Sequence, residues 1–178
     1  MKLLKILDNG GYTEDMPLIY KQTVRAVILR GGKIVMQKSS SGEYKIPGGG
    51  LEQGEDAADA LYREVLEEAG MKVNTKSMTE IGEIIELRCD VFEPEKKFER
   101  HTYYYLCEIT EEGLPLMLTE SEQEQGFICV WETPKIIYEC NKIICTSPNT
   151  VRDTVFIKML VDGEICLPNT EDKTKKGI

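Results

Sequence analysis

The strongest constraint in this sequence is a set of regular spacings within residues 49–71, GGLEQGEDAADALYREVLEEAGM. Four apolar residues share a stripe of about 80° on a helical wheel, namely Ala58, Leu61, Val65 and Ala69. An adjoining stripe of about 100° carries three carboxylates, those of Glu64, Glu67 and Glu68. The pattern predicts a helix that buries one face against a sheet and presents an acidic face beside it. Asp56 is placed to cap its start, and Gly70 suits a left-handed end.

Three carboxylates at this spacing repel one another on a bare helix. A hard divalent cation such as Mg²⁺ or Mn²⁺ removes the conflict, because such ions prefer carboxylate oxygens. The alternative is a solvated acidic face that binds nothing. The preceding segment, Pro47-Gly48-Gly49-Gly50, favours the metal site, since glycine lets the backbone approach a ligand closely.

The complete pattern resembles the Nudix box, G-x5-E-x7-R-E-U-x-E-E-x-G-U with U aliphatic, and matches it at every fixed position. The matching residues are Gly49, Glu55, Arg63, Glu64, Val65, Glu67, Glu68, Gly70 and Met71. The resemblance implies an α/β/α sandwich with a mixed β-sheet between helices. It also implies hydrolysis of a nucleoside diphosphate linked to another moiety, by water attack at phosphorus with Mg²⁺ or Mn²⁺.

Carried over residue by residue, the resemblance makes Glu64, Glu67 and Glu68 metal ligands and adds the Gly48 carbonyl. Some relatives use the residue at the Glu64 position as general base, so its role stays open. Arg63 and Glu55 match the structural ion pair of the box.

The resemblance further implies a catalytic glutamate in the loop before the last strand. Glu120, Glu122 and Glu124 lie there, and we take Glu124 and Glu122 as candidates because they are nearest the strand. Each is equally explained as surface charge.

Substrate contacts are expected from the early strands and the strand after the helix. The candidates are Arg25, Lys38, Lys45 and Tyr105. The three cations also suit a plain surface role, and Tyr105 also suits core packing.

The remaining residues predict strands at 3–7, 23–30, 33–38, 79–89, 101–109 and 127–131, and helices at 134–140 and 149–161. Gly31-Gly32 is expected to be a hairpin turn, residues 73–77 irregular, and residues 93–99 and 111–124 loops. Val151, Val155 and Met159 are predicted to form the apolar face of the last helix. We expect a lead-in at 1–20, a catalytic domain at 21–165 and a polar tail at 166–178.

The net charge of −9 argues against nucleic-acid binding, which normally needs a basic face. No apolar run of membrane-spanning length and no secretory leader is visible, so a cytoplasmic protein without a membrane partner is expected. The six cysteines lack metal-site spacing, and we interpret them as free thiols. The single histidine, His101, is interpreted as structural and near a strand end.

The expected partner is a small-molecule nucleotide: a nucleoside triphosphate, a nucleotide sugar, ADP-ribose or a dinucleotide. The sequence lacks the markers of the ADP-ribose, diadenosine-polyphosphate and coenzyme A subgroups. A non-catalytic nucleotide-sensing module is the alternative, but its box is usually degraded. RNA decapping is disfavoured by the acidic charge. Relatives are often dimers, which leaves a homodimer open.

Overall fold

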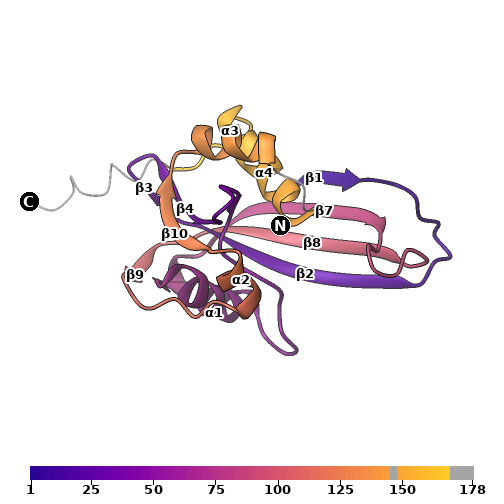
Figure 1. Ribbon diagram of the computed structural model, residues 1–178, viewed down its shortest axis with the longest axis horizontal. Coiled ribbons are helices and arrows are strands. Elements are labelled where there is room, and N and C mark those ends of the chain that lie inside the picture. Colours follow the sequence, from indigo (N-terminus) through magenta and orange to yellow (C-terminus); the bar gives the residue numbers. More distant parts are fainter. Residues whose placement is uncertain (145–147, 169–178) are drawn as a thin grey trace, which may run out of the picture.

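The computed structural model describes residues 1–144 and 148–168. The predictions for residues 169–178 of the tail and for Cys145 therefore lie outside the described residues. The predicted α/β/α arrangement with a mixed sheet is confirmed, with the strands divided between separate sheets (Figure 1).

The largest sheet has the strand order β1-β7-β8-β2. These strands are β1 (Leu3–Asp8), β7 (Thr79–Cys89), β8 (Lys97–Leu106) and β2 (Leu18–Val27). β7 and β8 are antiparallel to each other, whereas β1 runs parallel to β7 and β2 runs parallel to β8. This sheet extends beyond the helices as an arm, on the right in Figure 1.

The second sheet has the order β10-β4-β3, with β5 also paired to β4. Its strands are β3 (Leu29–Arg30), β4 (Lys33–Lys38), β5 (Tyr44–Lys45) and β10 (Ile128–Glu132). The predicted hairpin turn lies between β3 and β4, where Gly31 and Gly32 both have positive φ. β6 (Lys72–Val73) and β9 (Ile109–Glu111) form a small separate pair.

The helices cover opposite faces of the sheets and bury two apolar clusters. α1 (Ala57–Ala69) packs its Leu61 and Val65 against Val24 and Ala26 of β2. The other face is covered by α3 (Pro134–Ile144) and α4 (Pro148–Val161), whose cluster includes Val27 of the same strand. Consecutive residues of β2 therefore serve opposite cores, as the alternation of a strand requires.

Several strand boundaries differ from the prediction. β2 begins at Leu18, and β8 begins at Lys97, because these two strands pair along their whole length with Leu18 opposite Lys97. β2 also ends before Ile28. His101 consequently lies inside β8 and not at a strand end. Cross-strand pairing here includes residues whose own strand propensity is weak.

The segments expected to be irregular contain short elements. Residues 73–77 include a 3-10 helix, Thr75–Ser77. The polar loop at 111–124 ends in α2 (Glu120–Glu124), which is stabilised by a capping box between Thr119 and Glu122. α3 also continues beyond Cys140 to Ile144.

The predicted apolar face of α4 is only partly correct, because Val155 packs against the core whereas Val151 does not. Val151 is 43% exposed, whereas Arg152, Phe156 and Ile157 are fully buried. Phe156 stacks on Tyr104 of β8 with ring centroids 4.0 Å apart. The buried face includes a charged residue because that residue finds ionic partners inside the protein, which apolar periodicity alone does not reveal.

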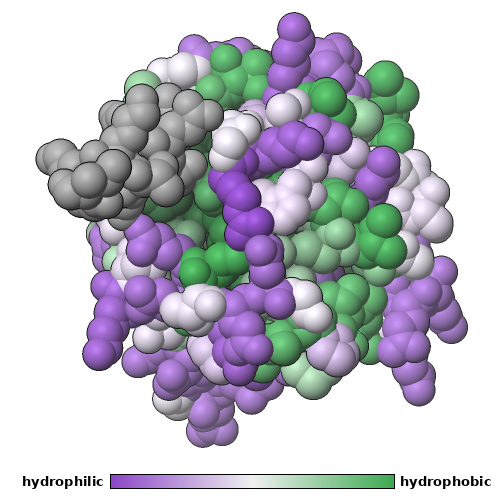
Figure 2. Space-filling view, turned by 90° about the vertical axis from the view of Figure 1, so that its left-hand side faces the viewer, coloured by the Kyte–Doolittle hydropathy of each residue, from purple (hydrophilic) through white to green (hydrophobic). Residues whose placement is uncertain are grey.

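The surface mixes polar and apolar residues, and Figure 2 shows this at the end of the molecule near β3 and β9. Within the described ranges, no helix is long and apolar enough to cross a membrane.

Candidate active site

The caps of α1 fix where the acidic face begins and ends. The Asp56 carboxylate accepts the N–H groups of Ala58 and Asp59, as predicted. Gly70 ends the helix in the left-handed conformation at φ 62°, also as predicted. Glu64, Glu67 and Glu68 thus lie on the last turns of α1, beside the face that contacts β2.

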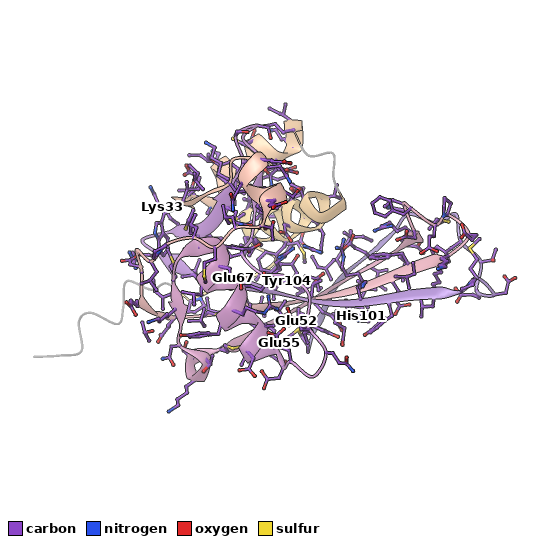
Figure 3. All side chains as sticks on the ribbon, turned by 60° about the horizontal axis from the view of Figure 1, so that its bottom comes forward. Lys33, Glu52, Glu55, Glu67, His101 and Tyr104 are labelled. Carbon is purple, nitrogen blue, oxygen red and sulfur yellow. The ribbon has the colours of Figure 1, made fainter. Side chains whose placement is uncertain are left out.

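The ion pair predicted between Arg63 and Glu55 is present and bidentate. Arg63 Nε and Nη2 donate to the two Glu55 carboxylate oxygens at 2.9 and 2.8 Å. Nη2 also donates to the Gly50 carbonyl at 3.2 Å, and Nη1 donates to Glu64 Oε1 at 2.6 Å. Arg63 therefore joins the loop before the helix to the acidic face. Figure 3 shows Glu52 and Glu55 where the extended strands leave the body of the molecule.

The glycine loop runs beside β2 and brings its backbone against the helix. Ala26 N–H donates to the Pro47 carbonyl and Val24 N–H donates to the Gly49 carbonyl, both at 2.9 Å. Between these two bonds, the Gly48 N–H points away from β2 and donates to Glu68 Oε2 at 2.7 Å.

The two glycines that meet the carboxylates have no room for a side chain. A Cβ at Gly48 would clash with the Val24 carbonyl, and its φ of 136° also disfavours other residues. A Cβ at Gly49 would overlap the Glu64 carboxylate, whose farther oxygen would lie only 2.7 Å away. The absence of these side chains lets the loop lie directly against β2 at Gly48 and lets Glu64 lie directly on the loop at Gly49.

Burial raises the pKa of both carboxylates. The pKa of Glu68, which is 8% exposed, rises to about 8, although Arg25 and the Gly48 N–H oppose the shift. Burial also raises the pKa of Glu64, against the lowering by Arg63 and Arg25. Glu67 is more exposed and lies 3.8 Å from Arg63 Nη1. The acidic face thus holds one buried carboxylate, that of Glu68, and two that are partly exposed, those of Glu64 and Glu67.

The loop that carries the other candidate glutamates is fastened to α1. Met117 N–H donates to the Glu67 carbonyl at 2.8 Å, and Leu114 N–H donates to the Gly70 carbonyl at 3.0 Å. Burial is the main cause of the raised Glu68 pKa, and the negative charge of Glu122 adds to the rise.

The Glu122 side chain also stabilises the start of α2. Its carboxylate accepts Thr119 N–H at 2.9 Å in the capping box of α2. Glu120 and Glu124 are exposed. Of the three loop glutamates, Glu122 is the one whose charge contributes to the raised pKa of Glu68, after burial and Glu64.

The four substrate-contact candidates do not meet at one place. Arg25 is 8% exposed and lies 3.6 Å from Asp153, so the surface interpretation of Arg25 is wrong. Lys38 lies over the Tyr44 ring and Lys45 over the Phe127 ring. Tyr105 is partly buried and packs against the core beneath α1.

A cavity of about 1130 Å³ opens beside the box. Its walls are one half of β2, the loop at residues 50–55 and the β7–β8 hairpin, including the side chains of Arg88, Phe98 and Arg100. Arg88 stacks over Phe98 at 3.9 Å, and Arg100 Nε donates to Glu86 at 2.7 Å. The cavity is large enough for a nucleotide-sized molecule.

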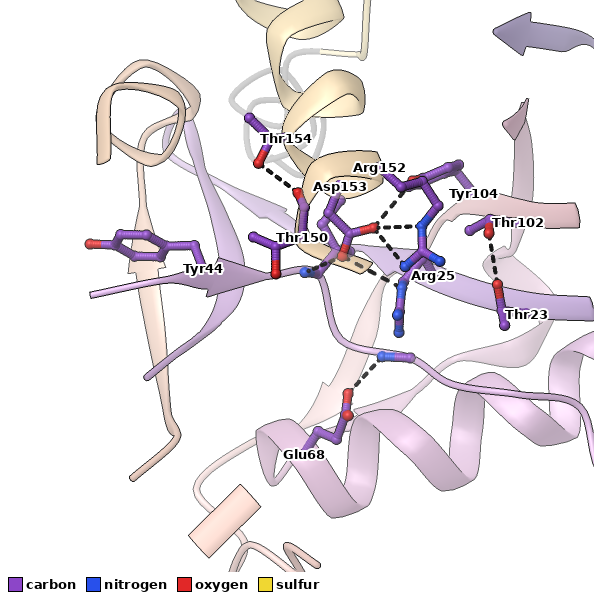
Figure 4. A network of polar contacts seen from close by, with 12 residues as sticks. Thr23, Arg25, Tyr44, Glu68, Thr102, Tyr104, Thr150, Arg152, Asp153 and Thr154 are labelled. Carbon is purple, nitrogen blue, oxygen red and sulfur yellow. Dashed lines mark hydrogen bonds and ion pairs between the residues drawn. The ribbon is translucent and has the colours of Figure 1, made fainter. Parts of the chain in front are cut away.

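Sequence reasoning missed a buried charged network on the far side of the glycine loop. It contains Arg152, Asp153 and Glu86, all of which are almost completely buried. Figure 4 shows Arg152 and Asp153. Arg152 contacts both carboxylates, with Nη2 3.0 Å from Asp153 and Nη1 3.4 Å from Glu86. Nothing in the sequence around Arg152 and Asp153 indicates that they are buried, beyond their position in a predicted helix.

The donor chemistry of the acidic face fits a hard divalent cation, because every candidate ligand is an oxygen. In this structure Glu64 is turned toward Arg63, and Glu68 accepts the Gly48 N–H. No three acidic, thiol or imidazole groups of the described ranges are arranged as a metal site. The Arg63 hydrogen bond engages Glu64 through its Oε1 atom.

Comparisons with known proteins agree with this geometry. The family model of the NUDIX domain matches residues 19–141. A MutT NUDIX hydrolase from Burkholderia pseudomallei has a similar structure, with a TM-score of 0.56, 17% identity and coverage of 79% of this chain and 97% of that one. A NUDIX hydrolase from Nitrosomonas europaea has a TM-score of 0.56 and 19% identity, covering 86% and 99%.

The MutT protein from Bacillus halodurans is similar with a TM-score of 0.53 and 18% identity, covering 79% of this chain and 82% of that one. No curated protein matches the sequence significantly. At these identities the solved structures establish the fold, and the domain match, which spans more than half of the sequence, establishes the family. The chain belongs to the Nudix hydrolase family.

Proposed function

We propose that this protein hydrolyses the pyrophosphate of a nucleoside diphosphate linked to another moiety, with Mg²⁺ or Mn²⁺ as cofactor. Nudix hydrolases act on small nucleotide substrates and generally use divalent metals. The observation that carries the proposal is the close approach of the glycine loop to two carboxylates, one buried and one partly buried. Gly48 donates to Glu68, and Gly49 leaves room for Glu64.

In this proposal Glu64, Glu67, Glu68 and the Gly48 carbonyl hold the cation. The cation shields the phosphate charges and lowers the pKa of a water that attacks phosphorus. The side chains of the protein orient the metal ligands and accept the proton of the water.

Arg63 orients Glu64 and couples it to the loop through Glu55 and Gly50. Glu122, and less directly Glu124, are the candidates for accepting the proton of the water. The Glu122 charge acts on Glu68, which supports Glu122 over Glu124.

The cavity beside the box is the proposed place for the remainder of the substrate. Its lining includes the guanidinium groups of Arg88 and Arg100, which suit the anionic part of a nucleotide derivative. We retain residues 21–165 as the proposed catalytic domain, since α4 completes one of the two cores.

The test is a panel assay with Mg²⁺ over nucleoside triphosphates, ADP-ribose, nucleotide sugars and dinucleoside polyphosphates. In ¹⁸O-water, label should appear in a phosphate product, because attack occurs at phosphorus. Nucleotide binding without turnover on any substrate would favour the sensing module instead.

Glu67→Gln and Glu68→Gln should abolish metal-dependent turnover while circular dichroism and the urea midpoint show an intact fold. Glu139→Gln on α3, an exposed glutamate, is the matched control and should keep full activity. Undiminished turnover in both box variants would contradict the assignment of these residues to the metal site.

A further inference from the structure

Polar groups of β2, β8, α4 and the segment after β5 converge on one fully buried carboxylate of α4, that of Asp153 (Figure 4). Its Oδ2 accepts the Ile46 N–H at 3.1 Å and lies 3.6 Å from Arg25 Nε. Its Oδ1 accepts the Tyr104 hydroxyl at 3.2 Å and Arg152 Nη2 at 3.0 Å. A buried group with this many partners has one allowed position.

The surroundings keep Asp153 charged. Burial alone would raise its pKa, but the guanidinium groups of Arg152 and Arg25 reverse the effect and lower the pKa below its ordinary value. A charged acceptor makes a stronger hydrogen bond to an N–H group than a neutral one does. The bond to Ile46 is therefore a firm link between α4 and the segment that follows β5.

This link lies next to the site. Only Pro47 separates Ile46 from Gly48, whose N–H donates to Glu68 at 2.7 Å. Proline restricts its own backbone and that of the residue before it, so the position of Ile46 is passed on to Gly48 with little freedom. Asp153 thus holds the loop from one side while Glu68 of α1 contacts it from the other.

A second side chain on the same side supports the segment farther from the site. Asn141 of α3 accepts the Tyr44 N–H at 2.8 Å and donates to the Tyr44 carbonyl at 2.9 Å. Tyr44 belongs to β5, whereas Asp153 is the contact nearest the glycines. The helices α3 and α4 do not carry the acidic face, yet they fix the path of the backbone segment that contacts this face.

We propose that Asp153 is a positioning residue for the proposed reaction: it holds the backbone at Ile46 so that Gly48 and Gly49 meet Glu68 and Glu64. This inference rests on the proposed function for its effect on turnover, but not for its effect on the loop. If Asp153 had only a structural role, its carboxylate would neutralise the buried charge of Arg152 and would not affect the loop.

The experiment compares three variants of the full chain at a temperature where each is folded. Asp153→Ala removes the acceptor of the Ile46 N–H, whereas Asp153→Asn keeps an acceptor oxygen. Tyr104→Phe is the matched control, because it removes another hydrogen bond to the same buried carboxylate without touching the loop. The readouts are amide exchange measured residue by residue by NMR, and kcat and KM on the best substrate of the panel.

In Asp153→Ala, exchange of the Ile46 and Gly48 amides should speed up by at least about tenfold, while the Val65 amide inside α1 keeps its rate. The kcat should fall by about 30-fold and KM by much less than that factor, since misplacement of reacting groups affects the chemical step. Asp153→Asn should recover most of both losses, and Tyr104→Phe should change neither by more than about threefold.

Unchanged exchange at Ile46 and Gly48 in a folded Asp153→Ala protein would overturn the proposal, as would equal losses in Tyr104→Phe. If the wild type turns over no substrate, the proposed function fails, and the exchange rates still decide the role of Asp153. If Asp153→Ala does not fold, amide exchange in the wild-type protein tests the proposal instead. Its Ile46 amide should exchange as slowly as that of Val65, and exchange more than about tenfold faster would overturn the proposal.

Discussion

Replacement of Gly49 by alanine is expected to separate activity from stability. Gly49 does not have positive φ, so alanine suits its backbone. The new Cβ would nevertheless lie 2.7 Å from the farther Glu64 oxygen, where ordinary contact begins at 3.4 Å. The Glu64 carboxylate must therefore retreat by at least about 0.7 Å, and its nearer atoms by more.

A displacement of about 1 Å in a reacting group can cost about 100-fold in rate. We therefore expect Gly49→Ala to lower kcat by about 100-fold, equivalent to about 2.7 kcal/mol of activation free energy. The free energy of unfolding, from urea titration followed by circular dichroism, should change by no more than about 1 kcal/mol. The assay is metal-dependent phosphate release at saturating substrate.

The neighbouring glycine provides the control. A Cβ at Gly50 would meet only the Gln22 carbonyl, at 4.0 Å, and Gly50 also lacks positive φ. Gly50→Ala should therefore keep kcat within about threefold of the wild type. A normal kcat in Gly49→Ala would refute the claim that Glu64 must lie on the loop, and equal losses in both variants would indicate a general disturbance of the loop.

Glu122→Gln should lower kcat more than Glu124→Gln, because the Glu122 charge acts on the acidic face whereas Glu124 is exposed; equal effects in steady-state assays would contradict this ranking. Arg152→Met should lower the free energy of unfolding by about 3 kcal/mol, because it leaves a buried carboxylate short of a partner; a loss below about 1 kcal/mol in urea titration would count against this view. Burial raises the pKa of the Cys107 thiol to about 12, so the unfolded chain releases this proton at lower pH than the folded protein. Stability should then fall as pH rises from about 9 to 12, and Cys107→Ala should make urea midpoints measured across that range fall less steeply.

Local chemistry explains why the acidic helix was predicted correctly. Its apolar stripe, its Asp56 cap and its Gly70 end all depend on neighbours within a few residues. The ion pair between Arg63 and Glu55 spans eight positions and belongs to the same local pattern. These features are present in the sequence before any tertiary contact forms.

The features that were missed depend on partners distant in sequence. Arg25 is explained by Asp153, which lies on the last helix and reaches β2 only in the folded chain. The buried face of α4 could not be predicted from apolar spacing, because Arg152 is charged and finds Glu86 on β7. The short helix α2 was expected to be loop, and it is stabilised by the capping box between Thr119 and Glu122.

The strand order β1-β7-β8-β2 has a consequence for how the protein forms during synthesis. The strands β1 and β2 leave the ribosome before the β7–β8 hairpin, with which both pair and which ends at Leu106. Each of these strands must wait with unpaired backbone until its distant partner strand has been made. Pairings between such distant segments close late and slowly. A nascent chain halted before Leu106 should therefore hold its amino-terminal strands open to chaperones, and one halted well beyond it should not.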